Sequence, residues 1–125
     1  GIDLNSRAIE HCKKLGFNCM KSNLFENVKE KFDIVIFNPP YLPLDKTEPK
    51  DSRVATTGGK TGSEIINKFL KQAKKHLNKN GKIFLLTSSL TKGIDFLDYK
   101  KKKITEENLF FEKLFVFVTS IEYAL

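Results

Sequence analysis

One hydrophobic run that ends at two prolines constrains this chain more than any other feature. Residues 32–37 read Phe-Asp-Ile-Val-Ile-Phe, a β-branched and aromatic stretch typical of a parallel strand buried on both faces. The run stops at Asn38-Pro39-Pro40, because proline cannot donate to the hydrogen-bond ladder of a sheet. Ligand sites in open parallel sheets lie at the carboxyl ends of strands. The sequence therefore predicts a functional turn at residues 38–41.

Helical and extended patterns alternate around this run. Residues 42–62 have no sustained period and are rich in Pro, Asp, Thr and Gly, which predicts a long loop. The amphipathic pattern predicts a helix after Ser6, a possible cap, and a second helix that starts at Gly62 or Ser63 and ends near Asn80-Gly81. Further strands are expected at 17–20, 82–87, weakly near 104, and at 114–119. Strands alternating with helices predict a parallel α/β sheet in a single domain over residues 1–125.

Composition excludes some classes of protein and leaves others open. The 125 residues carry 22 Lys and Arg against 15 Asp and Glu, a net charge of +7 that would favour an anionic partner such as RNA. We interpret the lysine run 100–103 as a solvated turn, because no aromatic residues are interleaved with it. No apolar stretch is long enough to cross a bilayer, so a cytoplasmic location is expected. Cys12 and Cys19 lack metal-ligand spacing and are predicted to be buried, with no metal site.

The residue types of the turn indicate a reaction at a planar nitrogen. The lone pair of a carboxamide or an adenine amine is delocalised, which makes it a poor nucleophile. The side-chain carbonyl of Asn38 and the backbone carbonyl of Pro39 can accept hydrogen bonds from such an NH₂ group and orient it. Pro40 helps to fix the turn, and the Tyr41 ring can pack on the planar target. A plain strand-ending turn is the alternative, which the preceding buried strand disfavours.

Four segments resemble the HemK-type methyltransferases that modify a glutamine of peptide-chain release factors, especially their short archaeal and eukaryotic branch. Residues 1–5 resemble the family's second strand, 22–25 its adenine-contacting segment, 38–41 its catalytic signature, and 58–62 its Gly-Gly-x-x-Gly turn. The resemblance implies a Rossmann-like class I S-adenosylmethionine-dependent methyltransferase sheet. It identifies Asn38, Pro39, Pro40 and Tyr41 as the catalytic residues.

The resemblance also implies a set of cofactor-binding residues. Asp3 would hold the ribose hydroxyls of S-adenosylmethionine, with Leu4 beside it. Asn23 and Leu24 would contact the adenine, and Asn38 belongs to the cofactor site as well as to the catalytic turn. The family's usual residue at position 23 is Asp, so Asn23 departs from the pattern and changes the charge of the pocket.

The acceptor and the partners are also implied by the resemblance. The turn 58–62 and the run 109–116 favour a protein glutamine, on a release factor, over adenine. The family's first strand and glycine-rich loop have no counterpart here, so we expect the C-terminal part of one methyltransferase domain. A small zinc-binding activator subunit is the implied partner. Two other functions stay open: an adenine-N6 methyltransferase of DNA or RNA, for which nucleic acid would be the partner, and a non-catalytic fragment or assembly module.

Overall fold

The computed structural model describes residues 1–121 of the chain. The polypeptide divides into two compact units, Gly1–Glu30 and Lys31–Leu125, which we call unit 1 and unit 2. Within residues 1–121, no helix combines the length and the apolar character that crossing a membrane requires.

Unit 1 consists of one helix between two short parallel strands. Its elements are β1 (Ile2–Asp3), α1 (Ser6–Lys14) and β2 (Met20–Lys21). Ser6 was a possible cap of this helix, but the cap is Asn5. Its Oδ1 accepts hydrogen bonds from the amides of Arg7 at 2.9 Å and Ala8 at 3.3 Å, which satisfies two of the unpaired amides of the first turn.

Two further predictions in unit 1 are wrong in detail. The strand expected at 17–20 forms only at Met20–Lys21, because only these residues pair with β1. Cys12 and Cys19 are half-buried instead of buried. The reason is that α1 turns Ile9, which is 6% exposed, into the small core of this unit, while most of its other residues face solvent.

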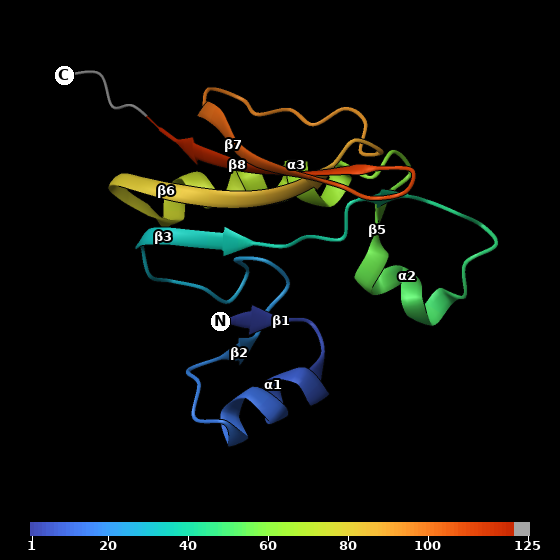
Figure 1. Cartoon of the computed structure of the whole chain (residues 1–125). Coiled ribbons are helices and arrows are strands. Elements are labelled where there is room, and N and C mark those ends of the chain that lie inside the picture. Colours follow the sequence, from blue (N-terminus) through green and yellow to red (C-terminus); the bar gives the residue numbers. More distant parts are fainter. Residues whose placement is uncertain (122–125) are drawn as a thin grey trace. The chain divides into compact units, whose positions relative to one another are not determined.

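Unit 2 contains a four-stranded sheet with helices along one side (Figure 1). Its elements are β3 (Phe32–Phe37), β4 (Leu42–Pro43), α2 (Lys50–Thr56), β5 (Thr57–Gly59), α3 (Glu64–Ala73), the 3₁₀ helix η1 (Lys74–His76), β6 (Leu77–Ser88), β7 (Lys100–Asn108) and β8 (Lys113–Ser120). The strand predicted at 32–37 is confirmed at both ends. The strands predicted at 82–87 and 114–119 lie within β6 and β8.

The sheet is mixed, although the sequence predicted a parallel one. Its order is β3-β6-β8-β7. Strands β3 and β6 are parallel, whereas β8 runs antiparallel to both β6 and β7. The difference has a topological cause: β7 and β8 follow each other through a short hairpin, and a hairpin joins antiparallel strands. As a result the carboxyl ends of β3, β6 and β7 all lie at the same end of the sheet.

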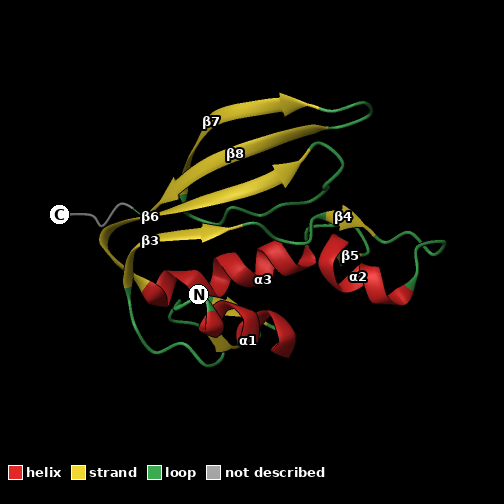
Figure 2. Cartoon of the chain, turned by 60° about the horizontal axis from the view of Figure 1, so that its bottom comes forward, coloured by secondary structure: helices red, strands yellow, loops and turns green. Residues whose placement is uncertain are grey.

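The core of unit 2 lies between the sheet and α3, which runs along one face of the sheet (Figure 2). The buried face of α3 meets inward-facing residues of β3 and β6, and the rings of Phe37 and Phe69 lie 4.2 Å apart. Ile66, Leu70 and Ile83 are completely buried. Each such side chain stabilises the fold by about 1.5–3 kcal/mol relative to an exposed one.

The second face of β3 is exposed, contrary to the prediction that this strand is buried on both faces. Ile34 is 60% and Ile36 is 78% exposed. Successive side chains of a strand point to opposite faces, so only Val35 and Phe37 reach the side that carries α3. A continuous apolar run shows that both faces tolerate burial, but it cannot show which elements cover them.

The loop predicted at 42–62 contains regular structure. It includes β4, α2 and β5, and β4 pairs in parallel with β5. The Glu48 carboxylate accepts hydrogen bonds from Thr56 Oγ1 at 2.5 Å and Ser52 Oγ at 2.9 Å. Arg53 Nη2 donates to the carbonyl of Lys46 at 2.8 Å. These local side-chain contacts order the segment without a hydrophobic period.

Two other boundaries also differ from prediction. Leu77 begins β6, whereas the sequence pattern extends the preceding helix to near Asn80-Gly81. The lysine run 100–103 lies in β7, an edge strand, and not in a turn. Lys101 Nζ lies 4.2 Å from the ring centroid of Phe96, and Lys103 Nζ lies 5.0 Å from that of Phe115. Aromatic residues from other segments therefore pack under lysines that the sequence shows without aromatic neighbours.

Candidate active site

The Asn-Pro-Pro-Tyr turn follows the carboxyl end of β3. Asn38 is exposed, Pro39 is buried, and Pro40 and Tyr41 are half-buried. Within residues 1–121, the Asn38 side chain makes no hydrogen bond, so both its oxygen and its NH₂ group are available to a ligand. The turn therefore presents one polar side chain to solvent from a backbone that is partly embedded in the protein.

A hydrogen bond from the loop after the neighbouring strand, β6, fixes the backbone of this turn. Thr91 Oγ1 donates a hydrogen bond of 2.7 Å to the carbonyl of Tyr41. Thr91 is 9% exposed and belongs to the loop after β6, where its amide donates to the carbonyl of Ser88 at 3.0 Å. Because β3 and β6 are adjacent and parallel, their following loops meet at one edge, where this bond fixes the turn.

The glycine-rich turn 58–62 packs directly against the same backbone. A Cβ on Gly58 would lie 2.5 Å from the carbonyl oxygen of Pro40, and one on Gly62 would lie 2.4 Å from that of Tyr41. Gly62 also has a φ of +93°, which favours glycine. The resemblance identified this turn as a family feature, and the structure gives it a physical role: only glycine allows the two backbones to approach this closely.

The turn after β7 supplies a carboxylate to the site. Glu112 accepts a hydrogen bond from Ser88 Oγ, which itself accepts one from the amide of Leu90 at 3.1 Å. Burial raises the pKa of the Tyr41 phenol, and the negative charge of Glu112 raises that pKa further. Both effects favour the neutral phenol, so the Tyr41 hydroxyl is a hydrogen-bond donor at physiological pH, as an ordinary tyrosine hydroxyl is.

In unit 1, Asp3 and Asn23 lie at the ends of neighbouring strands. Strands β1 and β2 pair with Asp3 opposite Lys21, and the amide of Ser22 donates to the carbonyl of Asp3 at 3.0 Å. The Asp3 side chain accepts from the amide of Asn5 through Oδ1 at 2.8 Å. Asp3 and Asn23 are both exposed.

The polar groups of Asp3 and Asn23 fit a nucleoside. Within the described residues, Asp3 Oδ2 makes no hydrogen bond, so it can accept from vicinal hydroxyls, and the amide of Asn23 can pair with a base. Leu4, which is 50% exposed, and Leu24, with a φ of 53°, flank these two residues and offer apolar surface.

The predicted site residues therefore form two groups. Asp3, Leu4, Asn23 and Leu24 lie in unit 1, and the catalytic turn, including Asn38, lies in unit 2. In residues 1–121, no group of three or more His, Cys, Asp or Glu side chains could hold a metal ion.

Sequence reasoning missed Thr91, Ser88 and Glu112. A signal existed for the first two, because they follow a predicted strand at its carboxyl end, the position that had identified the Asn-Pro-Pro-Tyr turn. No local signal identifies Glu112, since its contact with Ser88 joins residues 24 positions apart and depends on the β7–β8 hairpin.

Comparison with known families gives a match over most of the chain. A family model described as the Eco57I restriction-modification methylase matches residues 1–117. A Methanocaldococcus jannaschii protein named as a protein N5-glutamine methyltransferase is 40% identical over 99 residues, which are 73% of this chain and 50% of the relative. A release factor glutamine methyltransferase of Borreliella burgdorferi is 36% identical over 97 residues, which are 66% of this chain and 34% of that protein. The chain thus spans half or less of the length of these relatives.

Solved structures share the fold. The Mtq2–Trm112 complex of E. cuniculi, responsible for methylation of the eRF1 translation termination factor, superimposes with a TM-score of 0.73 at 24% identity, covering 97% of this chain and 70% of that chain. A ribosomal protein L11 methylase from Lactobacillus delbrueckii subsp. bulgaricus gives a TM-score of 0.52 at 18% identity, covering 98% of this chain and 56% of that chain. The Rossmann-like class I methyltransferase fold predicted from the sequence is confirmed.

Proposed function

This chain belongs to the family of the Eco57I restriction-modification methylases, and we propose that it is part of an S-adenosylmethionine-dependent N-methyltransferase acting on a glutamine of a translation release factor. The observation that carries the proposal is the exposed Asn38 amide on a turn braced by Thr91 and Gly62. The names of the two curated relatives support glutamine as the acceptor.

The residues of the turn have complementary roles in this reaction. The Asn38 side-chain oxygen and the Pro39 carbonyl accept the two N–H bonds of the glutamine amide. This orients the nitrogen lone pair toward the methyl group, and positioning of this kind is worth on the order of several kcal/mol of barrier. The neutral Tyr41 ring packs on the planar amide. Pro40, which has no amide N–H, limits the motion of the turn.

The cofactor would be held by unit 1. Asp3 and Asn23 offer acceptors for the ribose hydroxyls and the adenine amine of S-adenosylmethionine, with Leu4 and Leu24 along the base. The cofactor supplies an electrophilic methyl group on a sulfonium. We further propose that residues 1–125 are the C-terminal part of one methyltransferase domain, since unit 1 carries hydrogen-bond acceptors for a cofactor and unit 2 carries the turn that would receive the target amide.

Mass spectrometry of a release factor incubated with the full protein and S-adenosylmethionine tests the proposal. A gain of one methyl group on a glutamine is expected, and the Asn38→Ala variant should lose it. A matched variant, Asn18→Ala, changes another exposed asparagine of the chain and should retain it. Absence of methylated glutamine with wild-type protein that binds S-adenosylmethionine would contradict the proposal.

Adenine is the second candidate acceptor. The family description names restriction-modification methylases, and a ribosomal RNA small subunit methyltransferase C of Psychromonas ingrahamii is 26% identical over 121 residues, so both names support a nucleic-acid substrate. The amine of adenine is planar and could donate the same two hydrogen bonds to Asn38 and Pro39. Parallel assays with DNA, ribosomal RNA and release factor separate the possibilities. Methylation of adenine alone would replace glutamine as the assigned acceptor.

A small zinc-binding activator subunit is the partner that we propose. The E. cuniculi structure is a complex with Trm112, which supports an activator of this kind. A release-factor substrate would place the reaction in the cytoplasm, where translation ends. Co-purification of the full protein from its native cells is the direct test, and failure to recover any small zinc protein would count against this partner.

A further inference from the structure

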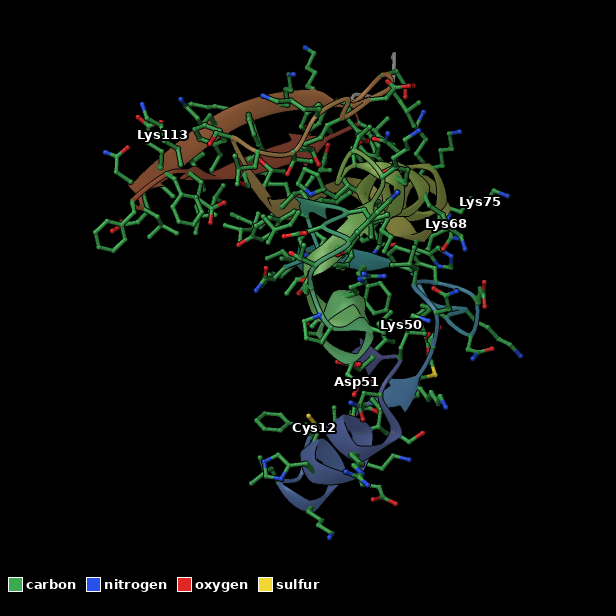
Figure 3. The ribbon with its side chains drawn as sticks, turned by 90° about the vertical axis from the view of Figure 1, so that its right-hand side faces the viewer. Cys12, Lys50, Asp51, Lys68, Lys75 and Lys113 are labelled. Atoms are coloured by element: carbon green, nitrogen blue, oxygen red, sulfur yellow. The ribbon has the colours of Figure 1, made fainter. Side chains whose placement is uncertain are left out.

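The tip of the β7–β8 hairpin lies at the same edge of the sheet as the candidate active site. Strands β3, β6 and β7 point in one direction, so the turns that follow them share one edge. The turn after β3 is the Asn-Pro-Pro-Tyr motif, and the turn after β7 comprises residues 109–112. Figure 3 shows Lys113, the first residue of β8, on this hairpin.

The tip is strongly apolar and exposed. Leu109 is 46%, Phe111 is 82% and Phe110 is fully exposed. Two adjacent phenylalanines in a hairpin turn contribute nothing to the core of the sheet. They leave apolar area in water that folding alone does not explain, and exposed apolar patches of this kind commonly mark interaction sites.

Hydrogen bonds connect this tip to the active-site loop. Glu112 bonds to Ser88, and Ser89 exchanges two bonds with Lys113: its amide donates to the Lys113 carbonyl at 2.8 Å, and its Oγ accepts from the Lys113 amide at 2.9 Å. Thr91 of the same loop donates to Tyr41. The hairpin is therefore held in a fixed position next to the turn that would receive the glutamine.

We propose that residues 109–111 form the docking point for the substrate polypeptide, binding an apolar side chain close to the acceptor glutamine. This inference rests on the proposed function and deepens it by specifying how the protein substrate is recognised. Exposed aromatic anchors surrounded by rigid structure are the typical high-energy contacts of protein interfaces. Continuity with the acceptor turn is what assigns the tip to the substrate.

The charge around the tip favours a polypeptide over nucleic acid. Glu107 and Glu112 lie close to the aromatic residues in the sequence and would repel phosphates, whereas Glu106 forms an ion pair of 3.3 Å with Lys103. The lysines of β7 are at the other end of the strand, and Lys101 and Lys103 lie over aromatic rings of the protein itself. Bases could stack on Phe110, but their backbone would meet carboxylates there.

Kinetics of tip variants in the full protein test the inference. We expect Phe110→Ser and Phe111→Ser to raise the KM for intact release factor about ten-fold, as loss of an interface aromatic commonly does. The kcat and the KM for S-adenosylmethionine should stay near wild type. Ile104→Ser is the matched control, because Ile104 is 48% exposed on the same hairpin but away from the tip. Phe110→Leu should recover most of the affinity.

A second probe and a binding measurement separate docking from other effects. A short glutamine peptide whose neighbours are all glycine should be methylated equally by wild type and variants. Release-factor binding, measured by calorimetry, should weaken in the variants whether or not methyl transfer occurs. If the wild type binds but transfers no methyl group, the proposed function fails while the docking result still stands.

Several results would overturn the docking proposal. Unchanged release-factor affinity in both serine variants is the first. A second is weaker binding of single-stranded RNA with normal release-factor affinity, which would assign the tip to nucleic acid. Loss of a dimer, seen by sedimentation, with normal release-factor affinity would assign the tip to a second copy. Loss of a co-purified activator subunit with normal release-factor affinity would assign the tip to that subunit. Thermal unfolding of each variant verifies that the fold is intact.

Discussion

The hydroxyl of Thr91 donates a 2.7 Å hydrogen bond to the backbone carbonyl of Tyr41, 50 residues earlier in the chain. The two residues belong to turns that follow adjacent parallel strands, β3 and β6. The bond joins the loop after one strand to the turn after the other, so the position of Asn38 depends on a residue that touches neither the glutamine nor the cofactor. Thr91 is therefore a positioning residue in the proposed reaction.

Replacing Thr91 with valine should reveal this role. The substitution keeps the shape of the side chain but removes the donor, and we expect a loss of about 1 kcal/mol in stability. The kcat for glutamine methylation should fall as well, because the turn is no longer fixed. Denaturant unfolding and steady-state kinetics measure the two effects. Thr105→Val, an exposed change in β7, is the control and should alter neither.

Removing the Asn38 amide should affect chemistry more than folding. Asn38 is exposed and makes no hydrogen bond within residues 1–121, so Asn38→Ala should leave the unfolding midpoint unchanged. The kcat should drop about a hundred-fold, since the target nitrogen loses one of its two orienting acceptors. Single-turnover kinetics with intact release factor would show this. A large loss of stability with normal kcat would contradict the assigned role.

Two of the four glycines with positive φ, Gly16 and Gly62, provide a matched pair. Gly62→Ala and Gly16→Ala both place a side chain at a φ near +90°, at a cost of about 1–3 kcal/mol. Only at Gly62 would the new Cβ meet the Tyr41 carbonyl, at 2.4 Å, whereas nothing lies within 4 Å at Gly16. We therefore expect both variants to lose stability, and Gly62→Ala to lose methyl transfer as well. Equal activity in the two variants would show that the close approach is unimportant.

Neutralising Glu112 should lower the pKa of Tyr41. The pKa is raised from 10.0 first by burial and then by the Glu112 charge, so Glu112→Gln should bring it down without restoring the ordinary value. Alkaline titration followed by phenolate absorbance detects the shift, and Tyr41→Phe identifies the signal among the 3 tyrosines. Glu107→Gln, an exposed change in β7, serves as control. An unchanged Tyr41 titration would exclude the electrostatic contact.

Acid should loosen the segment between β4 and β5. Hydrogen bonds from Thr56 and then Ser52 hold the pKa of Glu48 below its usual 4.5. A carboxyl with a lowered folded pKa stabilises the native state above its unfolded pKa and loses this contribution as pH falls through the folded value. The protection factors of the amides of residues 45–57, which allow for the slower intrinsic exchange in acid, should therefore fall as the pH drops below 4.5. In Glu48→Gln the exchange should be faster at neutral pH and less sensitive to acid.

Three of the four strands of the sheet could be predicted because their sequences are unambiguous. Continuous β-branched and aromatic runs predicted the strands that became β3, β6 and β8, and the prolines predicted the turn after β3. That turn was also the part of the site that sequence could identify, because proline restricts the backbone locally. The roles of its residues, and those of Asp3 and Asn23, remain predictions.

Features that depend on distant contacts could not be predicted. The lysine run is predicted as a turn because no aromatic residues are interleaved with it, but the Nζ atoms of Lys101 and Lys103 lie over rings from the preceding loop and from β8. The segment with α2 is ordered by Glu48 and Arg53 through side-chain hydrogen bonds, which leave no periodic signal. Glu112 contacts Ser88 only because the β7–β8 hairpin brings the two residues together.

The lysines of β7 also affect how the protein behaves in concentrated solution. This strand is the outer edge of the four-stranded sheet, where unpaired amides and carbonyls can recruit another chain and begin aggregation. Lys100, Lys101, Lys102 and Lys103 are all exposed there, so two such edges that approach each other bring positive charges together. Added salt screens this repulsion over about 8–10 Å at physiological strength. Storage in low salt should therefore keep the protein dispersed longest.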